Sequence, residues 1–227
     1  QIEDFDAIIT PRTFNREELR FAIFGSQSSE KFDVLRGLLK RWLAAQFNCD
    51  VQTFFEPNGC GTRSGLVFCP WVNGAFGVQE LSFRLAGELQ RPVGMYAGGQ
   101  PKSWNATENW VAHKKATAHG FKNNLFPLLV ATKSFGMGID KPNIRYTVHY
   151  GIPPSIESFY QEAGRAGRDG HYASCCVIFS NDNRRRTETL LAPQTTLREI
   201  SQMLQQRVWD SDDDITRVMF FHEKAFK

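Results

Sequence analysis

The chain up to about residue 180 alternates between short apolar runs and longer segments in which hydrophobic residues recur at helical spacing. The short runs predict six strands, at residues 19–24, 66–69, 93–96, 126–132, 144–150 and 173–179. The longer segments predict helices at residues 32–43, 78–89 and 105–119, and a fourth helix capped by Ser155. Strands that alternate with helices form a parallel sheet with helices on both faces. The pattern therefore predicts an α/β fold, in which ligands bind at the carboxyl ends of the strands.

The pattern changes near the end of the chain. A basic helix is predicted to begin at residues 183–186, and Thr196 with Glu199 fits a capping box for another helix. That second helix has an apolar stripe, formed by Leu197, Ile200, Leu204 and Val208. We expect one domain at residues 1–182, with an irregular segment at about 48–63, and a helical extension at residues 183–227.

Composition is that of an ordinary globular protein, with 41% hydrophobic and 22% charged residues among 227. The net charge of +3 is too small to establish a nucleic-acid partner, although local basic patches are compatible with it. No apolar run approaches the roughly 20 residues that span a bilayer, so no membrane segment is expected. The chain begins with Gln1, and we expect it to be a piece of a longer protein.

The five cysteines argue against two structural roles. Their number is odd and no Cys-x-x-Cys pair occurs, so we expect neither a disulfide framework nor a four-cysteine zinc site. Free thiols fit a reducing compartment, and we expect an intracellular protein, in the cytoplasm, nucleoid or nucleus.

Residues 161–170, with the sequence QEAGRAGRDG, place Arg165 and Arg168 three residues apart. Arginine stays charged near neutral pH, and its planar fork matches phosphate oxygens. The glycines between and beside the arginines allow a ligand to approach closely. The spacing alone is equally compatible with a solvated basic turn that closes a helix at Asp169-Gly170.

Residues 131–142, with the sequence ATKSFGMGIDKP, follow a predicted strand. Backbone N–H groups of such a loop, together with the Thr132 and Ser134 hydroxyls, can hold a phosphodiester backbone. Asp140 can accept a hydrogen bond from a ribose hydroxyl or from an arginine. A Gly-x-Gly sequence is weak evidence by itself, and the segment could also be a plain connection between strands.

Taken together, the two segments resemble the second RecA-like lobe of superfamily-two helicases, and most of all the RecQ family of ATP-dependent DNA helicases. The resemblance is nearly continuous over residues 130–170 and is most specific in the sequence FGMGIDKP of residues 135–142. It extends more weakly over residues 13–180, where Arg16 belongs to a segment like the Phe-x-Arg-x-Asn-Leu sequence of the family. The fold that this resemblance implies is a RecA-like three-layer sandwich with a mostly parallel sheet.

The resemblance also implies roles for individual residues. Arg165 and Arg168 would act as arginine fingers toward the γ-phosphate of ATP, and Gln161 would sense the nucleotide. Gly138 and Asp140 would lie near the ribose and the interface between lobes. Contacts with DNA would come from Thr132, Lys133, Ser134 and, after the strand that ends at Cys69, from Trp71 and Asn73. ATP and Mg²⁺ would be bound mainly by an N-terminal RecA-like lobe, which is the expected protein partner together with DNA.

Three departures from the family pattern limit the expected activity. The chain has neither a Gly-x-x-x-x-Gly-Lys-[Ser/Thr] loop nor an Asp-Glu-x-His box, so we expect this piece alone to be inactive. Tyr96-Ala97-Gly98-Gly99 lacks a histidine that the family carries, and no cysteine for a zinc module follows Phe179.

The main hypothesis is a motor lobe of a 3′–5′ DNA helicase. The alternatives are a non-catalytic DNA-binding or docking module with a degenerate helicase fold, and a lobe of an RNA helicase.

Overall fold

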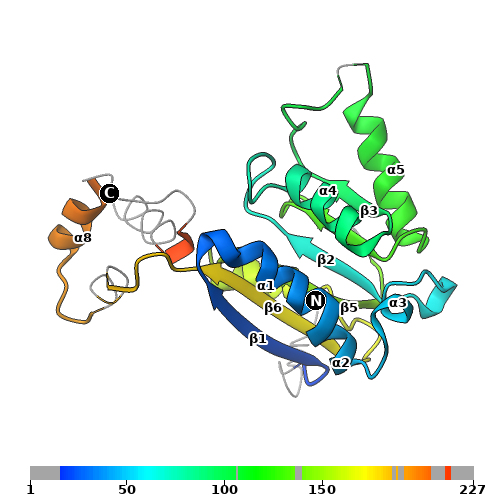
Figure 1. Ribbon diagram of the computed structural model, residues 1–227, viewed down its shortest axis with the longest axis horizontal. Coiled ribbons are helices and arrows are strands. Elements are labelled where there is room, and N and C mark those ends of the chain that lie inside the picture. Colours follow the sequence, from blue (N-terminus) through cyan, green and yellow to red (C-terminus); the bar gives the residue numbers. More distant parts are fainter. Residues whose placement is uncertain are drawn as a thin grey trace, which may run out of the picture.

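The computed structural model describes residues 16–105, 107–135, 140–185, 188, 192–205 and 213–215, and a parallel sheet of six strands lies at its centre (Figure 1). The strands are β1 (Leu19–Ser26), β2 (Ser64–Phe68), β3 (Val93–Tyr96), β4 (Leu128–Ala131), β5 (Ile144–His149) and β6 (Ala173–Ser180). Their order is β1-β6-β5-β2-β4-β3, and all neighbours run parallel. The predicted α/β fold is confirmed, and all six predicted strands are present.

Helices connect the strands. One long helical stretch consists of α1 (Lys31–Gly37), the π-helical segment η2 (Leu38–Leu43) and α2 (Ala44–Gln46). The other described helices are η1 (Ser28–Glu30), α3 (Val51–Phe54), η3 (Gly59–Gly61), α4 (Val78–Leu89), α5 (Trp110–Lys122), α6 (Ile156–Ala163) and α8 (Leu197–Gln205). In Figure 1, α1 lies in front of the sheet, whereas α8 stands apart from it on the side toward which β6 runs.

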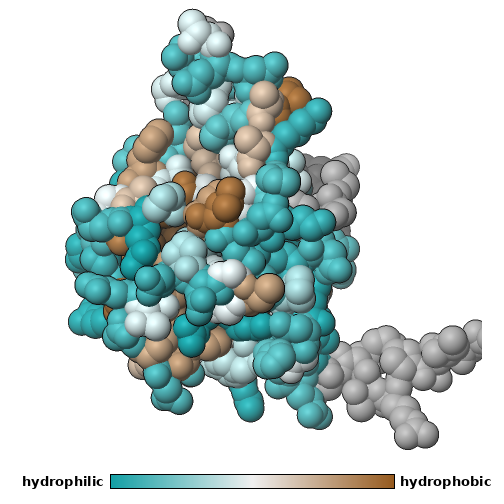
Figure 2. Space-filling model, turned by 90° about the vertical axis from the view of Figure 1, so that its right-hand side faces the viewer, coloured by the Kyte–Doolittle hydropathy of each residue, from teal (hydrophilic) through white to brown (hydrophobic). Residues whose placement is uncertain are grey.

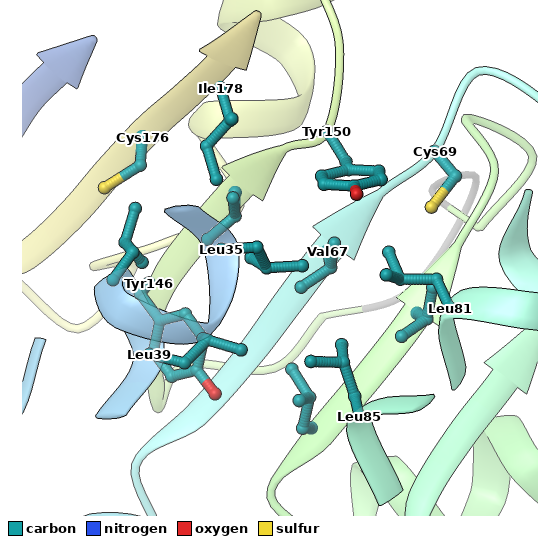
Figure 3. Close-up of a cluster of buried hydrophobic side chains, with 14 of the residues drawn as sticks. Leu35, Leu39, Val67, Cys69, Leu81, Leu85, Tyr146, Tyr150, Cys176 and Ile178 are labelled. Atoms are coloured by element: carbon teal, nitrogen blue, oxygen red, sulfur yellow. The ribbon is translucent and has the colours of Figure 1, made fainter. Parts of the chain in front are cut away.

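The larger hydrophobic core lies between the sheet and the helices α1, η2 and α4 (Figure 3). Leu35 and Leu39 come from the first helical stretch, Leu81 and Leu85 come from α4, and all four are fully buried. They pack against side chains of the central strands, among them Val67, Tyr146, Val148, Cys176 and Ile178. Each buried leucine contributes about 1.5–3 kcal/mol relative to an exposed one, so this layer is a main source of stability.

A second core covers the opposite face of the sheet. Leu66 and Phe68 of β2 point to this face, because they alternate with Val67, which points to the first. Phe121 of α5 and Ala163 of α6 complete the layer. The strands are therefore apolar on both faces, which explains why they read as short continuous hydrophobic runs in the sequence.

Two predicted segments differ in detail. The helix predicted at residues 105–119 is α5, which begins at Trp110, because the Asn109 side chain accepts hydrogen bonds from the N–H groups of Val111 (2.9 Å) and Ala112 (3.1 Å). This cap fixes the first turn five residues later than the hydrophobic pattern indicated. The irregular segment at 48–63 contains two short helices, α3 and η3.

The predicted capping box of the extension is confirmed at the start of α8. The Glu199 N–H donates to Thr196 Oγ1 (3.3 Å), and the Thr196 N–H donates to Glu199 Oε2 (2.8 Å). Val208 and Arg186, which belong to the predicted apolar stripe and basic helix, lie outside the described residues. The boundary between residues 182 and 183 stays a prediction.

The surface has little contiguous hydrophobic area on the face that Figure 2 shows, where hydrophobic residues stand apart among hydrophilic ones. Scattered exposed hydrophobic residues are normal for soluble domains. Within the described ranges, no helix is both long and apolar enough to cross a membrane.

Candidate nucleic-acid and nucleotide site

A cavity of about 580 Å³ lies at the carboxyl ends of β2, β4 and β5. Four residues predicted to contact nucleic acid line it: Trp71, Thr132, Lys133 and Ser134. They come from the loops after β2 and β4, which the parallel sheet brings to one edge. Gly98 and Gly99, which follow β3, and the segment Gly151–Pro154, which follows β5, also line the cavity.

The loop after β4 is held by both backbone and side chains. The Thr132 N–H donates to Tyr96 O (3.1 Å), and the Phe135 N–H donates to Thr132 O (3.0 Å). The Phe135 ring is buried against Tyr96 and Phe121 and anchors the loop. The Thr132 and Ser134 hydroxyls lie 2.7 Å apart, whereas the Lys133 side chain is exposed. The two neighbouring hydroxyl groups and the exposed Lys133 side chain can together bind a phosphodiester group.

The loop after β2 places Trp71 and Asn73 differently. Trp71 lines the cavity and is 45% exposed, so part of its ring is available for stacking on a base. Asn73 does not line the cavity; its Oδ1 accepts a hydrogen bond from the N–H of Lys102 (2.8 Å). The structure therefore assembles four of the five predicted nucleic-acid contacts in one cavity and gives Asn73 a local structural bond.

A histidine and a carboxylate lie at the wall of this cavity. His149 Nε2 and Glu162 Oε2 are 2.8 Å apart, and both side chains are buried. The two atoms are close, but their geometry is not that of a hydrogen bond, and neither ring nitrogen of His149 has a hydrogen-bond partner among the described residues. The His149 ring stacks on Phe68 at 5.3 Å. The sequence analysis did not identify this pair, because the two residues lie on different elements.

The turn after α6 carries the two arginines. Arg168 Nη1 donates to Asp140 Oδ1 at 3.0 Å, which joins the ends of the two sequence motifs directly. Asp140 is 83% exposed and Arg168 is 36% exposed, so the pair lies at the surface. Exposed pairs of this kind contribute little to stability and can exchange partners easily.

Arg165 lies deeper than Arg168. Its Nε atom is buried and has no hydrogen-bond partner among the described residues. Burial, together with the positive charge of Arg168, lowers the pKa of the Arg165 guanidinium, and Glu162 partly opposes that effect. A half-buried guanidinium whose Nε lacks an acceptor among the described residues is well suited to receive an anionic ligand.

A further ion pair fixes the end of the turn. Arg145 of β5 binds both carboxylate oxygens of Asp169, one of them with Nη1 at 2.9 Å. This bidentate contact holds the pKa of Asp169 at about 2. Sequence analysis read Asp169 only as part of a helix stop, and no spacing signal connects it to Arg145.

The remaining predicted site residues are less constrained. Gln161 is exposed on α6, and Gly138 lies outside the described residues. In the part of the chain that the structure describes, no cluster of histidine, cysteine, aspartate or glutamate could hold a metal ion.

Comparison with known proteins shows which family and which proteins the chain resembles. Residues 62–170 match the family described as the helicase conserved C-terminal domain. The ATP-dependent DNA helicase RecQ of Bacillus subtilis (strain 168) is 52% identical over 67 residues, which is 30% of this chain and 11% of that protein. A protein of Acanthamoeba polyphaga mimivirus that is named as an ATP-dependent RNA helicase is 50% identical over 68 residues, which is 30% of this chain and 12% of that protein.

Relatives that match a longer part of the chain are less identical to it. The ATP-dependent DNA helicase Q5 of Rattus norvegicus is 29% identical over 164 residues, which is 72% of this chain and 15% of that protein. The chain thus spans a small part of the length of each relative. Among solved structures, a DEAD box protein from the hyperthermophile Methanococcus jannaschii matches with a TM-score of 0.53 and 21% identity, over 76% of this chain and 38% of that chain. This likeness shows a shared RecA-like fold. The chain is therefore similar, over residues 62–170, to the C-terminal lobe of superfamily-two helicases, and the relatives that it matches include RecQ-like DNA helicases.

Proposed function

We propose that this chain is the C-terminal motor lobe of an ATP-dependent DNA helicase that translocates with 3′ to 5′ polarity. The observation that carries the proposal is the Arg168–Asp140 ion pair, because it places the arginine-bearing turn beside the end of the loop that follows β4. The proposed substrate, ATP, would lie between this lobe and an N-terminal lobe, which would supply most of its binding groups and those of Mg²⁺.

Arg165 and Arg168 are the proposed arginine fingers. Their guanidinium groups would stabilise the negative charge that develops on the γ-phosphate during hydrolysis. The partnered but exposed Arg168 can leave Asp140 for a phosphate at little cost. The Nε of Arg165 supports the same assignment, because it has no acceptor within the part of the chain that the structure describes and a phosphate oxygen would provide one.

The cavity formed by Trp71, Thr132, Lys133 and Ser134 is the proposed site for the DNA strand. Glu162 lines this cavity and lies three residues before Arg165, near the end of α6. Its position supports a mechanical link between the proposed DNA site and the proposed nucleotide site. A change in the position of α6 would therefore alter both the cavity proposed for DNA and the turn that carries Arg165 and Arg168. We propose that this lobe alone does not hydrolyse ATP, because it offers only half of the nucleotide site.

The test uses the full-length protein that contains this chain. Arg168→Ala and Arg165→Ala should each lower DNA-stimulated ATP hydrolysis, by about 10³-fold or more for a true finger. Arg41→Ala, on the exposed side of η2, is the matched control and should retain wild-type activity. Activity within twofold of wild type in both finger variants would refute the assignment.

A second candidate is an RNA helicase lobe, because one of the most similar relatives is named as an RNA helicase. Competition between single-stranded DNA and RNA for the full-length protein, read as stimulation of ATP hydrolysis, separates the two. A protein that binds DNA but hydrolyses no ATP with either nucleic acid would instead support a non-catalytic binding module.

A further inference from the structure

Arg16 lies next to the arginine-bearing turn, although it is far from it in the sequence. Its Nη2 donates to the carbonyl oxygen of Ala166 at 2.9 Å, and its Nη1 donates to that of Gly164 at 3.3 Å. These carbonyls flank Arg165 on either side. A single guanidinium therefore spans the backbone of the residue that carries one of the two proposed fingers.

The Arg16 side chain is itself held in place. Its Nε donates to the carboxylate of Glu18, and this hydrogen bond lowers the pKa of Glu18. The Glu18 carbonyl accepts a hydrogen bond from the N–H of Ala173 (2.9 Å), which ties the start of β1 to β6. The guanidinium is thus fixed to the sheet at one end and to the turn at the other.

The start of β1 also packs closely against the turn at Gly167. The Gly167 N–H donates to the carbonyl of Ile144 (3.0 Å), and Gly167 has a φ of +64°. A Cβ atom at Gly167 would lie 2.9 Å from Glu18 Cγ and 3.0 Å from the carbonyl oxygen of His171. The start of β1 therefore packs closely against the turn, and the glycine is needed both for this approach and for the left-handed backbone.

We propose that Arg16 is a positioning residue for the arginine turn: by bonding the carbonyls of Gly164 and Ala166, it sets the direction in which Arg165 and Arg168 point. This inference rests on the proposed function, since it assigns Arg16 a role in the geometry of those fingers. Arg16 does not itself contact ATP. Hydrogen bonds from a charged donor to a carbonyl are stronger than neutral ones, so two of them can hold a short turn.

The test compares Arg16→Ala, Arg16→Lys and Arg168→Ala in the full-length protein, with ATP hydrolysis measured at saturating single-stranded DNA. Misplaced fingers should lower kcat for Arg16→Ala by about tenfold to a hundredfold. KM for ATP and the melting temperature should change little, because the turn keeps its other hydrogen bonds. Arg16→Lys should recover part of kcat, and so should guanidinium ions added at low concentration to Arg16→Ala, since they can occupy the vacated position.

A purely structural role predicts a different result, in which the melting temperature falls and neither lysine nor guanidinium restores kcat. That result, or a kcat within twofold of wild type, would overturn the proposal. Arg168→Ala distinguishes a failure of the positioning role of Arg16 from a failure of the proposed function of the turn. If Arg168→Ala abolishes hydrolysis while Arg16→Ala does not affect it, only the positioning role is wrong; if Arg168→Ala is fully active, the proposed function of the turn is wrong.

Discussion

Lys31 and Asp214 form a buried ion pair between segments that are 183 residues apart, with 2.5 Å between Lys31 Nζ and Asp214 Oδ2. Asp214 Oδ2 also accepts hydrogen bonds from the N–H (2.9 Å) and the hydroxyl (3.2 Å) of Ser180. Lys31 Nζ lies 4.9 Å from the centre of the Tyr150 ring and 5.0 Å from that of Phe76. The segment 213–215 is thereby attached to the ends of the sheet and to the first helical stretch.

Removal of the lysine charge should destabilise the fold strongly. Lys31→Met removes the buried positive charge that pairs with the buried Asp214 carboxylate, which costs about 3 kcal/mol or more in free energy of unfolding. Urea unfolding at neutral pH measures this loss. Lys40→Met is the matched control, because the Lys40–Glu88 pair is only partly buried and its loss should shift the urea midpoint much less. Equal shifts in the two variants would contradict a stabilising role for the buried pair.

The Arg145–Asp169 contact predicts a specific acid sensitivity. The pKa of Asp169 falls from 3.8 to about 2 in the folded protein, so its stabilising effect is present above pH 4 and is lost as the pH falls toward 2. After allowance for solvent screening, the effect amounts to about 1 kcal/mol. Asp169→Asn should therefore be less stable than wild type at pH 5, and the difference should shrink at pH 2. Thermal unfolding at both pH values tests this, with Asp33→Asn as an exposed control.

Lys133 should bind the nucleic-acid backbone without reading its sequence. If the cavity holds a phosphodiester, Lys133→Ala weakens single-strand binding and lowers the slope of log K against log salt by about 0.7. Binding titrations over a range of salt concentrations give the slope. Lys115→Ala, an exposed lysine of α5 that does not line the cavity, should leave the slope unchanged. An unchanged slope in Lys133→Ala would show that this side chain makes no phosphate contact.

Two glycines should respond to alanine in opposite directions. A Cβ at Gly65 of β2 would lie 1.9 Å from the ring of Tyr146, which is completely buried. Gly65→Ala should therefore destabilise the protein by about 1–3 kcal/mol or prevent folding. Gly87 is exposed in α4 and would meet nothing within 4 Å, so Gly87→Ala should stabilise by about 0.5–1 kcal/mol. Urea unfolding of both variants measures the two signs.

The sheet could be predicted from the sequence because its central strands are buried on both faces and its strands are separated by helices. Leu66, Val67 and Phe68 are all apolar, so no polar residue interrupts the hydrophobic run that predicts β2. Boundaries set by single side-chain hydrogen bonds were harder to predict, as the Asn109 cap of α5 shows. The π-helical segment η2 was also missed, because its buried leucines recur at a spacing that an α-helix also produces.

Some residues of the candidate site could likewise be predicted from the sequence, and others could not. Residues in loops that follow parallel strands could be placed at one edge from topology alone, and Thr132 and Trp71 indeed line one cavity. The pairs Arg145–Asp169 and His149–Glu162 could not be predicted, because contacts between distant elements leave no periodic signal. Asn73 was assigned by its position in a loop, but its side chain bonds the neighbouring segment instead.

The position of β1 at the edge of the sheet has a consequence for how the protein is made. The neighbour of β1 is β6, and Leu19 pairs with Ala173, so β1 is synthesised long before the strand with which it pairs. Phe21 and Ile23 stay largely exposed even after pairing. During synthesis β1 cannot pair with β6 until residues 173–180 have been made, and an apolar strand that is unpaired in this interval favours aggregation and chaperone binding.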